Sequence, residues 1–293
     1  MADLPLVSIV CLSMNHEKYI EKSFASVVNQ TYANVEIWYA DNNSTDVSFE
    51  KGNSIFKQSG LAYKGFKREK NYGISANLNF LISKCRGKYI TIISADDWWE
   101  HSNLAEKIAY YEKHPQYGML YGTGFFYDYT TNETEVENLT NFKSGWVLKE
   151  VVTRNFINAI GVIIKKETFI EVGLFDEASL LEDWDMWIRI AEKKEIGFFD
   201  QPLVYYGQTG KNVSSNKLFM NEGYEYIFKK YSHYKEIESA RKFYQLMDLY
   251  DDANEEPRLK NLSRLLTHCQ FTALHFRQVI KCVLGIAGIK INK

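Results

Sequence analysis

Short apolar runs alternate with segments of helical periodicity through the first hundred residues. Three of the runs have the length and the β-branched or aromatic content of buried strands: residues 7–12, 35–40 and 89–94. A further strand signal lies near Lys70, and apolar residues recur at helical spacing around residues 19–29 and 78–82. Strands separated by helices in this order predict a doubly wound, mostly parallel α/β sheet.

The strand at residues 89–94 is followed almost directly by two carboxylates, Asp96 and Asp97. In open parallel sheets, ligands bind beyond the carboxyl ends of the strands. Adjacent carboxylates repel each other unless a cation or hydrogen-bond donors neutralise them, and Mg²⁺ or Mn²⁺ prefers such oxygen ligands. A solvated turn before a helix that begins near Asn103 is the alternative explanation of the pair.

Polar residues also follow the second apolar run and precede the helix at residues 78–82. Asp41 and Asn42 stand where Asp or Asn can form a turn or cap a helix, and where an acidic group can bind a nucleobase or a ribose. Asn71 and Gly73 precede a helix, whose amino end favours an anion, and glycine permits close approach of a ligand to the backbone. These residues alone leave turn chemistry and nucleotide binding both open.

Composition and charge narrow the class of protein. With 45% apolar and 25% charged residues, the 293-residue chain has the composition of an ordinary soluble globular protein. A formal net charge of −2 argues against a nucleic-acid partner. The four cysteines are widely separated, which favours neither a zinc site nor a disulfide framework, and the first residues lack the basic region of a signal peptide. We therefore expect a cytoplasmic protein.

Acidic residues gather at the start of a later helical pattern. Glu182, Asp183 and Asp185 stand where apolar residues begin to recur at helical spacing. Acidic residues in a first turn stabilise a helix through its dipole, and this is the simpler explanation from the residues alone. The functional alternative is a general base, a carboxylate that takes a proton from an attacking hydroxyl group.

Taken together, the motifs resemble those of the family-2 glycosyltransferases, the large inverting family of the GT-A fold. The matching stretches stand in the family's order over about residues 5–215: VSIVCLSMN, KSFASVVNQTY, WYADNNSTD, NYGISANLN, GKYITIISADDWW, GLFDE and LLEDWDMWIRI. The resemblance implies transfer of a sugar from a nucleotide-diphosphate donor, with the nucleotide bound by the Rossmann-like amino-terminal half of the sheet.

The resemblance also implies a role for individual residues of the nucleotide site. The nucleotide would be bound by the loops after the first two strands and by the loop before the helix at 78–82: Leu12, Ser13, Asn15, Asp41, Asn42, Asn71 and Gly73. Asp97 would hold Mn²⁺ or Mg²⁺, and Asp96 would be directed toward the ribose or a metal-bound water. The metal would neutralise the leaving diphosphate.

On the acceptor side, the resemblance implies that Asp183 is the catalytic base and that Glu182 and Asp185 support it. Three tryptophans are expected to offer a ring face to a sugar: Trp98, Trp99 and Trp184. Trp187 is instead expected to anchor its helix in the core.

The sequence departs from the family's usual motifs at five positions. Leu12 stands where Pro is frequent, and Ser94 replaces the first Asp of the D-x-D motif. Asn42 stands where a second Asp is frequent, which alters the donor–acceptor polarity and leaves the identity of the base open. Gly207 and Thr209 stand where relatives often carry Arg and His.

Two regions are expected along the chain. Residues 1–220 would form the transferase domain, with the nucleotide-sugar half at about 1–100 and the acceptor half at about 101–220, and residues 221–293 a helical extension. The stretch 257–293 carries seven basic residues and no acidic one, with apolar residues at helical spacing. Such a helix lies in the interface of an anionic membrane, or packs on the enzyme or on a second copy of the chain as a homodimer.

From these features we predict an enzyme of polysaccharide biosynthesis that transfers a sugar from a nucleotide-diphosphate donor, with UDP-sugars favoured, to a hydroxyl group of a glycan or lipid-linked acceptor. Two other classes stay open: a non-catalytic nucleotide-sugar-binding protein and a membrane-associated scaffold subunit of glycan assembly. If the basic tail binds lipid, the cytoplasmic protein would be attached peripherally to the inner face of the membrane.

Overall fold

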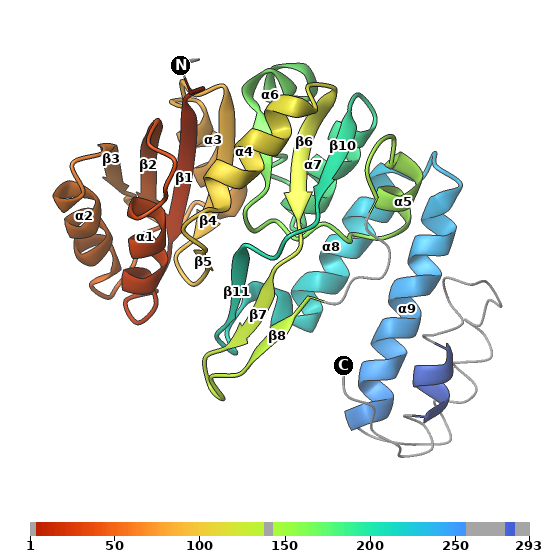
Figure 1. Cartoon of the computed structure of the whole chain (residues 1–293). Coiled ribbons are helices and arrows are strands. Elements are labelled where there is room, and N and C mark those ends of the chain that lie inside the picture. Colours follow the sequence, from red (N-terminus) through yellow and green to blue (C-terminus); the bar gives the residue numbers. More distant parts are fainter. Residues whose placement is uncertain (1–3, 138–142, 256–278, 285–293) are drawn as a thin grey trace. The chain divides into compact units, whose positions relative to one another are not determined.

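The computed structural model describes residues 4–137, 143–255 and 279–284 of the chain (Figure 1). The chain divides into two compact units: residues 1–151 with 156–223, and residues 152–155 with 224–293. The first unit carries the β-strands, and the described part of the second is helical. The basic tail predicted at 257–293 lies outside the described residues, except for 279–284.

In the described part of the chain, seven strands form the central sheet, in the order β10-β6-β9-β4-β1-β2-β3. Their bounds are β1 Val7–Ser13, β2 Val35–Asp41, β3 Ala62–Lys67, β4 Tyr89–Ser94, β6 Tyr117–Gly122, β9 Ile163–Lys165 and β10 Glu195–Phe199. All neighbouring pairs are parallel except those of β9, which is antiparallel to β4 and β6. The mostly parallel α/β sheet expected from the sequence is confirmed, with one reversed strand.

A second, smaller sheet has the order β5-β11-β7-β8. Its bounds are β5 Trp98–Trp99, β7 Phe125–Asp128, β8 Thr134–Val136 and β11 Val204–Gln208. β11 is parallel to β7 and antiparallel to β5. Because β5 begins directly after Asp97, the chain connects this sheet to the carboxyl end of β4.

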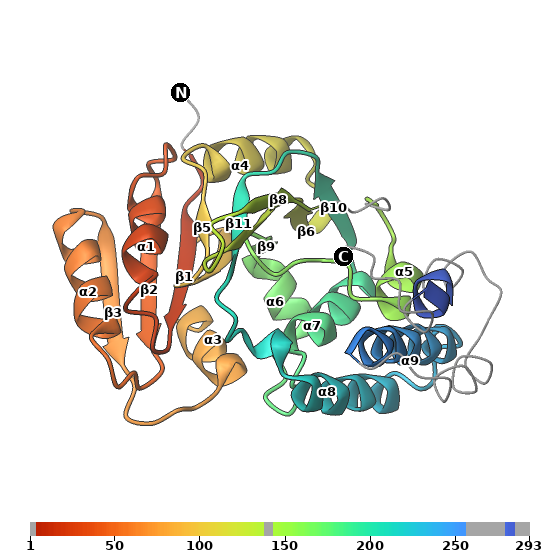
Figure 2. The ribbon, with the colours of Figure 1, turned by 90° about the horizontal axis from the view of Figure 1, so that it is seen from below.

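Helices cover both faces of the central sheet. α1, α2 and α4 lie on one face, and α3, α6 and α7 lie on the other (Figure 2). Their bounds are α1 Ile20–Val28, α2 Ser48–Gln58, α3 Ile74–Ile82, α4 Asn103–Lys113, α6 Lys166–Val172 and α7 Glu182–Ala191. The shorter helices are α5 Leu148–Thr153 and the 3₁₀ turn η1 Val213–Ser215.

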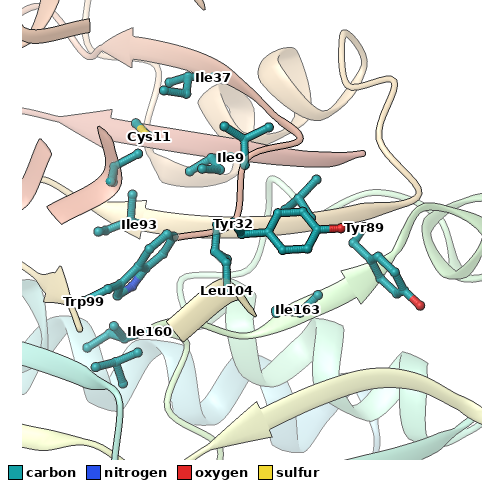
Figure 3. Close-up of a cluster of buried hydrophobic side chains, with 14 of the residues drawn as sticks. Ile9, Cys11, Tyr32, Ile37, Tyr89, Ile93, Trp99, Leu104, Ile160 and Ile163 are labelled. Carbon is teal, nitrogen blue, oxygen red and sulfur yellow. The ribbon is translucent and has the colours of Figure 1, made fainter. Parts of the chain in front are cut away.

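A continuous apolar core fills the space between the central sheet and α1, α2 and α4. Ile9 of β1, Ile37 of β2 and Leu104 of α4 contribute to it (Figure 3). The ring of Phe24 stacks on that of Phe56 with centroids 4.5 Å apart, which joins α1 to α2. Burial of this apolar surface is the main stabilising contribution to the sheet, so its carboxyl edge is a rigid support for the loops.

Two elements were only weakly indicated by the pattern. The alternation of strands and helices implies a helix between residue 40 and the strand signal near Lys70, and α2 lies there although Gly52 lowers the local helix propensity. A Cβ atom at Gly52 would lie 2.8 Å from the ring of Phe24, so this glycine permits close packing of α1 and α2. β3 ends at Lys67, before the strand signal near Lys70, and it is an edge strand without a buried apolar run. Tertiary packing therefore decides both elements.

The second unit contains the carboxyl part of α8 (Lys217–Lys230) and α9 (Glu236–Glu255). The rings of Tyr224 and Tyr244 stack with centroids 4.1 Å apart, and Arg241 Nη1 contacts both carboxylate oxygens of Glu225 at 2.6 and 2.8 Å. A small buried cluster comprises Leu246, Leu249, Val279 and Cys282. The helical carboxyl-terminal part is confirmed, and among the described helices none has the length and apolar character needed to cross a membrane.

Candidate active site

The parallel strands bring several of the sequence-predicted residues to one edge of the central sheet. Ser13 of β1 is level with Asp41 of β2, and Leu12 is level with Ser94 of β4. The loops that follow these strands therefore begin at the same edge, as the parallel pairing requires.

Asp96 and Asp97 lie at this edge and are both buried, with 8% and 5% of their surfaces exposed. Asp97 Oδ1 accepts a hydrogen bond of 2.9 Å from the backbone N–H of Gly207, and Asp96 Oδ2 accepts one of 3.4 Å from Asn212 Nδ2. Asp96 Oδ1 is buried, and the described residues give it no hydrogen-bond partner. Burial and then the charge of Asp96 raise the pKa of Asp97 well above its usual range.

These two carboxylates fit a divalent cation that shares its coordination with water and substrate. Within the described ranges, neither Asp96 nor Asp97 forms an ion pair with a Lys or Arg. No cluster of three or more His, Cys, Asp or Glu side chains in this part of the chain could hold a metal ion by itself. Mg²⁺ and Mn²⁺ are often bound by one or two carboxylates together with substrate phosphates, so Asp97 and Asp96 are the residues that would hold one.

Gly207 explains one departure from the family's motifs. A Cβ atom at this position would lie 2.0 Å from the carbonyl oxygen of Asp96, so no larger residue fits. The hydroxyl of Tyr129 donates to the same carbonyl oxygen over 3.1 Å. β11 therefore contacts the carboxylate pair through the backbone of Gly207, and the loop after β11 contacts it through the side chain of Asn212. The sequence did not predict that three residues contact this pair: Gly207, Tyr129 and Asn212. Of these, Gly207 alone was indicated in advance, because a glycine stands where relatives often carry Arg.

Asp41 is fully buried, and both oxygens of its carboxylate are hydrogen-bonded. Its Oδ1 accepts from the backbone N–H of Ser44 over 2.8 Å, and its Oδ2 accepts from the hydroxyls of Ser13 at 2.6 Å and Ser44 at 2.5 Å. These bonds link the ends of β1 and β2.

Asn42 holds the loop that precedes α3. Its Oδ1 accepts from the backbone N–H of Tyr72 at 2.9 Å and from Asn77 Nδ2 at 2.8 Å, and its Nδ2 donates to Asn71 Oδ1 over 2.8 Å. Gly73 turns the chain into α3 with φ 82°, and its N–H also donates to Asn71 Oδ1, over 2.9 Å. Asn42, Asn71 and Gly73 therefore belong to one network.

Asn15 and Leu12 connect the first loop to its neighbours. Asn15 adopts a left-handed conformation with φ 56°, and its Oδ1 accepts from the backbone N–H of Thr45 over 2.9 Å. The carbonyl oxygen of Leu12 accepts from the N–H of Ala95 over 2.9 Å. These contacts join the loop after β1 to those after β2 and β4.

Glu182 and Asp183 occupy the first turn of α7. Asp183 Oδ1 accepts a hydrogen bond of 2.6 Å from the backbone N–H of Trp184. Burial and then the charge of Asp183 raise the pKa of Glu182 to about 8.

Asp185 points into the core, where it is fully buried. Its Oδ2 pairs with Arg189 Nε at 2.9 Å, and Arg189 also donates to the carbonyl oxygens of Val172 at 2.7 Å and Leu174 at 2.9 Å. Any support that Asp185 gives to the start of α7 would act through this connection to the end of α6.

The three tryptophans expected to face a sugar are all buried. Trp98, Trp99 and Trp184 are 8%, 2% and 0% exposed. Trp184 Nε1 donates to the carbonyl oxygen of Val151 over 2.7 Å, and the Trp98 ring stacks on Tyr205 with centroids 4.8 Å apart. The expectation of a sugar-facing tryptophan is corrected, because these rings serve packing. Trp187 is fully buried, as expected.

Most of the residues described above lie in a segment that matches a known family. The family described as glycosyl transferase family 2 matches residues 8–167. A protein of Haemophilus influenzae, described as an uncharacterized glycosyltransferase, is 30% identical over 217 residues, which are 73% of this chain and 84% of the relative. One of Methanocaldococcus jannaschii is 24% identical over 235 residues, 80% of this chain and 81% of the relative.

Two solved structures share the fold over nearly the whole chain. S. aureus TarS 1-349 in complex with UDP-GlcNAc has a TM-score of 0.64 at 15% identity, covering 97% of this chain and 83% of that one. The mannosyltransferase PcManGT from Pyrobaculum calidifontis, in complex with GDP-Man and Mn²⁺, has a TM-score of 0.66 at 16% identity, covering 98% and 88%. The family match and the shared fold together define a glycosyltransferase of the GT-A fold. The chain belongs to glycosyltransferase family 2.

Proposed function

We propose that this glycosyltransferase transfers a sugar, with inversion, from a nucleotide-diphosphate donor to a hydroxyl group of a glycan or lipid-linked acceptor. The observation that carries the proposal is the buried pair Asp96 and Asp97 at the carboxyl end of β4, which lacks a cationic partner among the described residues and leaves Asp96 Oδ1 without a donor. Such a pair is stable when a divalent cation and a diphosphate complete it.

The solved structures with the same fold support the class of donor. One was obtained with UDP-GlcNAc and the other with GDP-Man and Mn²⁺. A UDP-sugar is the donor we favour, with Mn²⁺ or Mg²⁺ as the cofactor. A cation held by Asp97 and Asp96 supplies electrostatic stabilisation of the negative charge on the departing diphosphate.

The remaining steps are assigned to groups of the chain itself. The N–H of Gly207 and the amide of Asn212 fix the two carboxylates in place, which lowers the reorganisation required when the donor binds. Asp183 accepts the proton of the attacking hydroxyl group as that oxygen bonds to the anomeric carbon. Glu182, whose pKa is raised by burial and by the charge of Asp183, supports the base from the same turn of α7.

The proposal is tested with a panel of UDP-, GDP-, CDP- and ADP-sugars in the presence of Mn²⁺. One donor should raise the melting temperature selectively and release its nucleoside diphosphate when an acceptor is present, and EDTA should abolish both effects. NMR of the product should show the anomeric configuration opposite to that of the donor. Binding without turnover across a panel of glycan and lipid-linked acceptors would instead indicate a non-catalytic nucleotide-sugar-binding protein.

A further inference from the structure

Asn79 of α3 holds the backbone of Phe175 through both ends of its side-chain amide. Its Nδ2 donates to the carbonyl oxygen of Phe175 over 2.9 Å, and its Oδ1 accepts from the N–H of the same residue over 2.9 Å. A backbone N–H can only donate, so these two bonds fix which end of the amide faces which backbone group. Asn79 Nδ2 also donates to Oε1 of Glu177 over 3.2 Å. Asn79 therefore joins α3 to residues that lie almost one hundred positions later in the sequence.

The segment that Asn79 contacts is also held by α7. We call residues 172–177 the bridging segment. Arg189 of α7 donates from Nη1 to the carbonyl oxygen of Val172 over 2.7 Å and from Nη2 to that of Leu174 over 2.9 Å. Its Nε pairs with the fully buried carboxylate of Asp185 at 2.9 Å, so all three guanidinium nitrogens are engaged. The bridging segment thus connects α3 with α7, which lie on the same face of the central sheet (Figure 2).

The chain runs from the bridging segment through a short turn into the first turn of α7. Asp176 closes this turn, because its Oδ1 accepts from the N–H of Ala178 over 3.0 Å and its carbonyl oxygen from that of Ser179 over 3.1 Å. Ser179 and Leu181 are buried. Since the connection is both hydrogen-bonded and buried, a displacement of the bridging segment moves the start of α7, where Asp183 lies.

The amino end of α3 belongs to the network of the loop that precedes it. α3 begins directly after Gly73, and Asn77 Nδ2 donates to Asn42 Oδ1 over 2.8 Å. Asn77 and Asn79 keep a fixed separation because both lie within one regular helix. α3 therefore has one contact with the loops at which we place the donor and another with the segment that precedes the proposed base.

We propose that Asn79 is a positioning residue for the base Asp183: through the bridging segment it sets the distance between Asp183 and the bound donor. This inference rests on the proposed function, since it assumes that Asp183 takes the proton of an acceptor hydroxyl next to the donor. A misplacement of about 1 Å can cost on the order of a hundredfold in rate, so the contact acts on the transfer step and leaves donor affinity to the loops.

Asn79→Asp tests the contact with little change in side-chain shape. The new oxygen would face the Phe175 carbonyl and the Glu177 carboxylate, so both contacts of Nδ2 would become repulsive. With the nucleotide sugar that the wild-type protein turns over, kcat per donor-binding site should fall at least about tenfold. The dissociation constant of UDP with Mn²⁺ and the Mn²⁺ concentration at half-maximal activity should both stay within about threefold of wild type.

The donor-binding sites are counted by titration, which removes any unfolded fraction from the comparison. A merely structural role would therefore leave kcat per donor-binding site unchanged. Asn29→Asp adds the same charge at an exposed position just after α1 and should match wild type in all three measurements.

Hydrogen exchange measures the contact without any substrate. Backbone amides of residues 173–183 should exchange at least about tenfold faster in Asn79→Asp than in wild type, while those of α1 should be unchanged. Asn79→Ala removes the same bonds without adding a charge, and it should accelerate exchange in the same segment by a smaller factor.

The outcomes separate this inference from the proposed function. When wild type transfers sugar, a kcat per donor-binding site within about threefold of wild type in Asn79→Asp overturns the inference, and so does equal exchange of residues 173–183. A loss confined to UDP affinity, by more than about tenfold, also overturns it, because Asn79 would then act on the donor. If the wild-type protein binds no nucleotide sugar with Mn²⁺, the proposed function itself fails, and this inference falls with it.

Discussion

The backbone N–H of Gly207 donates a 2.9 Å hydrogen bond to Oδ1 of Asp97, across 110 positions of sequence. This contact joins the end of β11 to the carboxylate pair after β4. It depends on the absence of a side chain at Gly207, since a Cβ atom would lie 2.0 Å from the carbonyl oxygen of Asp96. The position of the proposed metal-binding carboxylates is therefore set in part by a glycine of β11.

Gly207→Ala should impair catalysis by displacing this contact. The added methyl group must move either β11 or the Asp96 carbonyl, and a small displacement at a metal-binding carboxylate can cost on the order of a hundredfold in rate. We expect a higher Mn²⁺ concentration at half-maximal activity and a lower kcat. The control is Gly210→Asn in the loop that follows β11, where φ is 72° and nothing lies within 4 Å of a Cβ atom. Equal Mn²⁺ dependence in Gly207→Ala and wild type would contradict the expectation.

Asp97→Asn should separate activity from stability. The substitution removes a buried carboxylate whose pKa is raised by burial and by Asp96, so the free energy of unfolding should stay the same or increase. Metal-dependent transfer should fall by about a hundredfold or more, because the amide no longer supplies a negative charge to the cation. Initial rates and urea unfolding at pH 7 measure the two effects. The exposed Asp200→Asn is the matched control, and Asp97→Asn transfer at the wild-type rate would exclude Asp97 as the metal residue.

Asp183→Asn tests the proposed base. Asn retains an oxygen that can accept from the N–H of Trp184, so the start of α7 should persist. Donor binding should remain near normal, and the loss should appear in kcat, by about a hundredfold to ten-thousandfold. Transfer within about tenfold of wild type would assign the base to another residue.

Glu182 should make the stability of the protein fall as pH rises. Its pKa is raised in the folded protein to about 8 from an ordinary value of 4.5, so between these values the folded state binds more protons than the unfolded state. The contribution of Glu182 is therefore most favourable below pH 4.5 and is lost as pH rises through about 8. Glu182→Gln should remove this pH dependence of stability. Its free energy of unfolding relative to wild type should therefore be higher at pH 9 than at acidic pH, by on the order of 2 kcal/mol. Urea unfolding of both proteins from pH 5 to 9 measures the difference, and parallel curves would refute the assignment.

Lys107 should make the stability of the protein rise with pH, which is the opposite of the trend expected for Glu182. Its side chain is fully buried, Nζ donates to the carbonyl oxygen of Gly161 at 2.9 Å, and burial lowers its pKa from 10.5 to about 7. Between these values the unfolded state binds more protons, so stability should rise with pH from about 7 to 10.5. The stability of Lys107→Met relative to wild type should therefore increase as pH falls from 10 to 7, by on the order of 1–3 kcal/mol. The exposed Lys113→Met in the same helix should show no such trend.

Some of the site followed from the sequence because it depends on neighbours along the chain. The alternation of strands and helices, the position of Asp96 and Asp97 after β4, and the acidic first turn of α7 are all local patterns. Periodicity and adjacency are properties of the chain itself, so they could be recognised before any contact was known. The parallel sheet then requires the strand ends to meet at one edge.

Tertiary structure alone decided how these residues are used. Hydrogen bonds hold Asp41, backbone N–H groups orient the amides of Asn42 and Asn71, and a distant glycine holds Asp97. Packing buried the tryptophans that the sequence had suggested for sugar binding, and it inserted β9 in the reversed direction. A residue's hydrogen-bond partners and solvent exposure depend on segments far away in sequence, and local pattern carries no information about which of these segments will meet it.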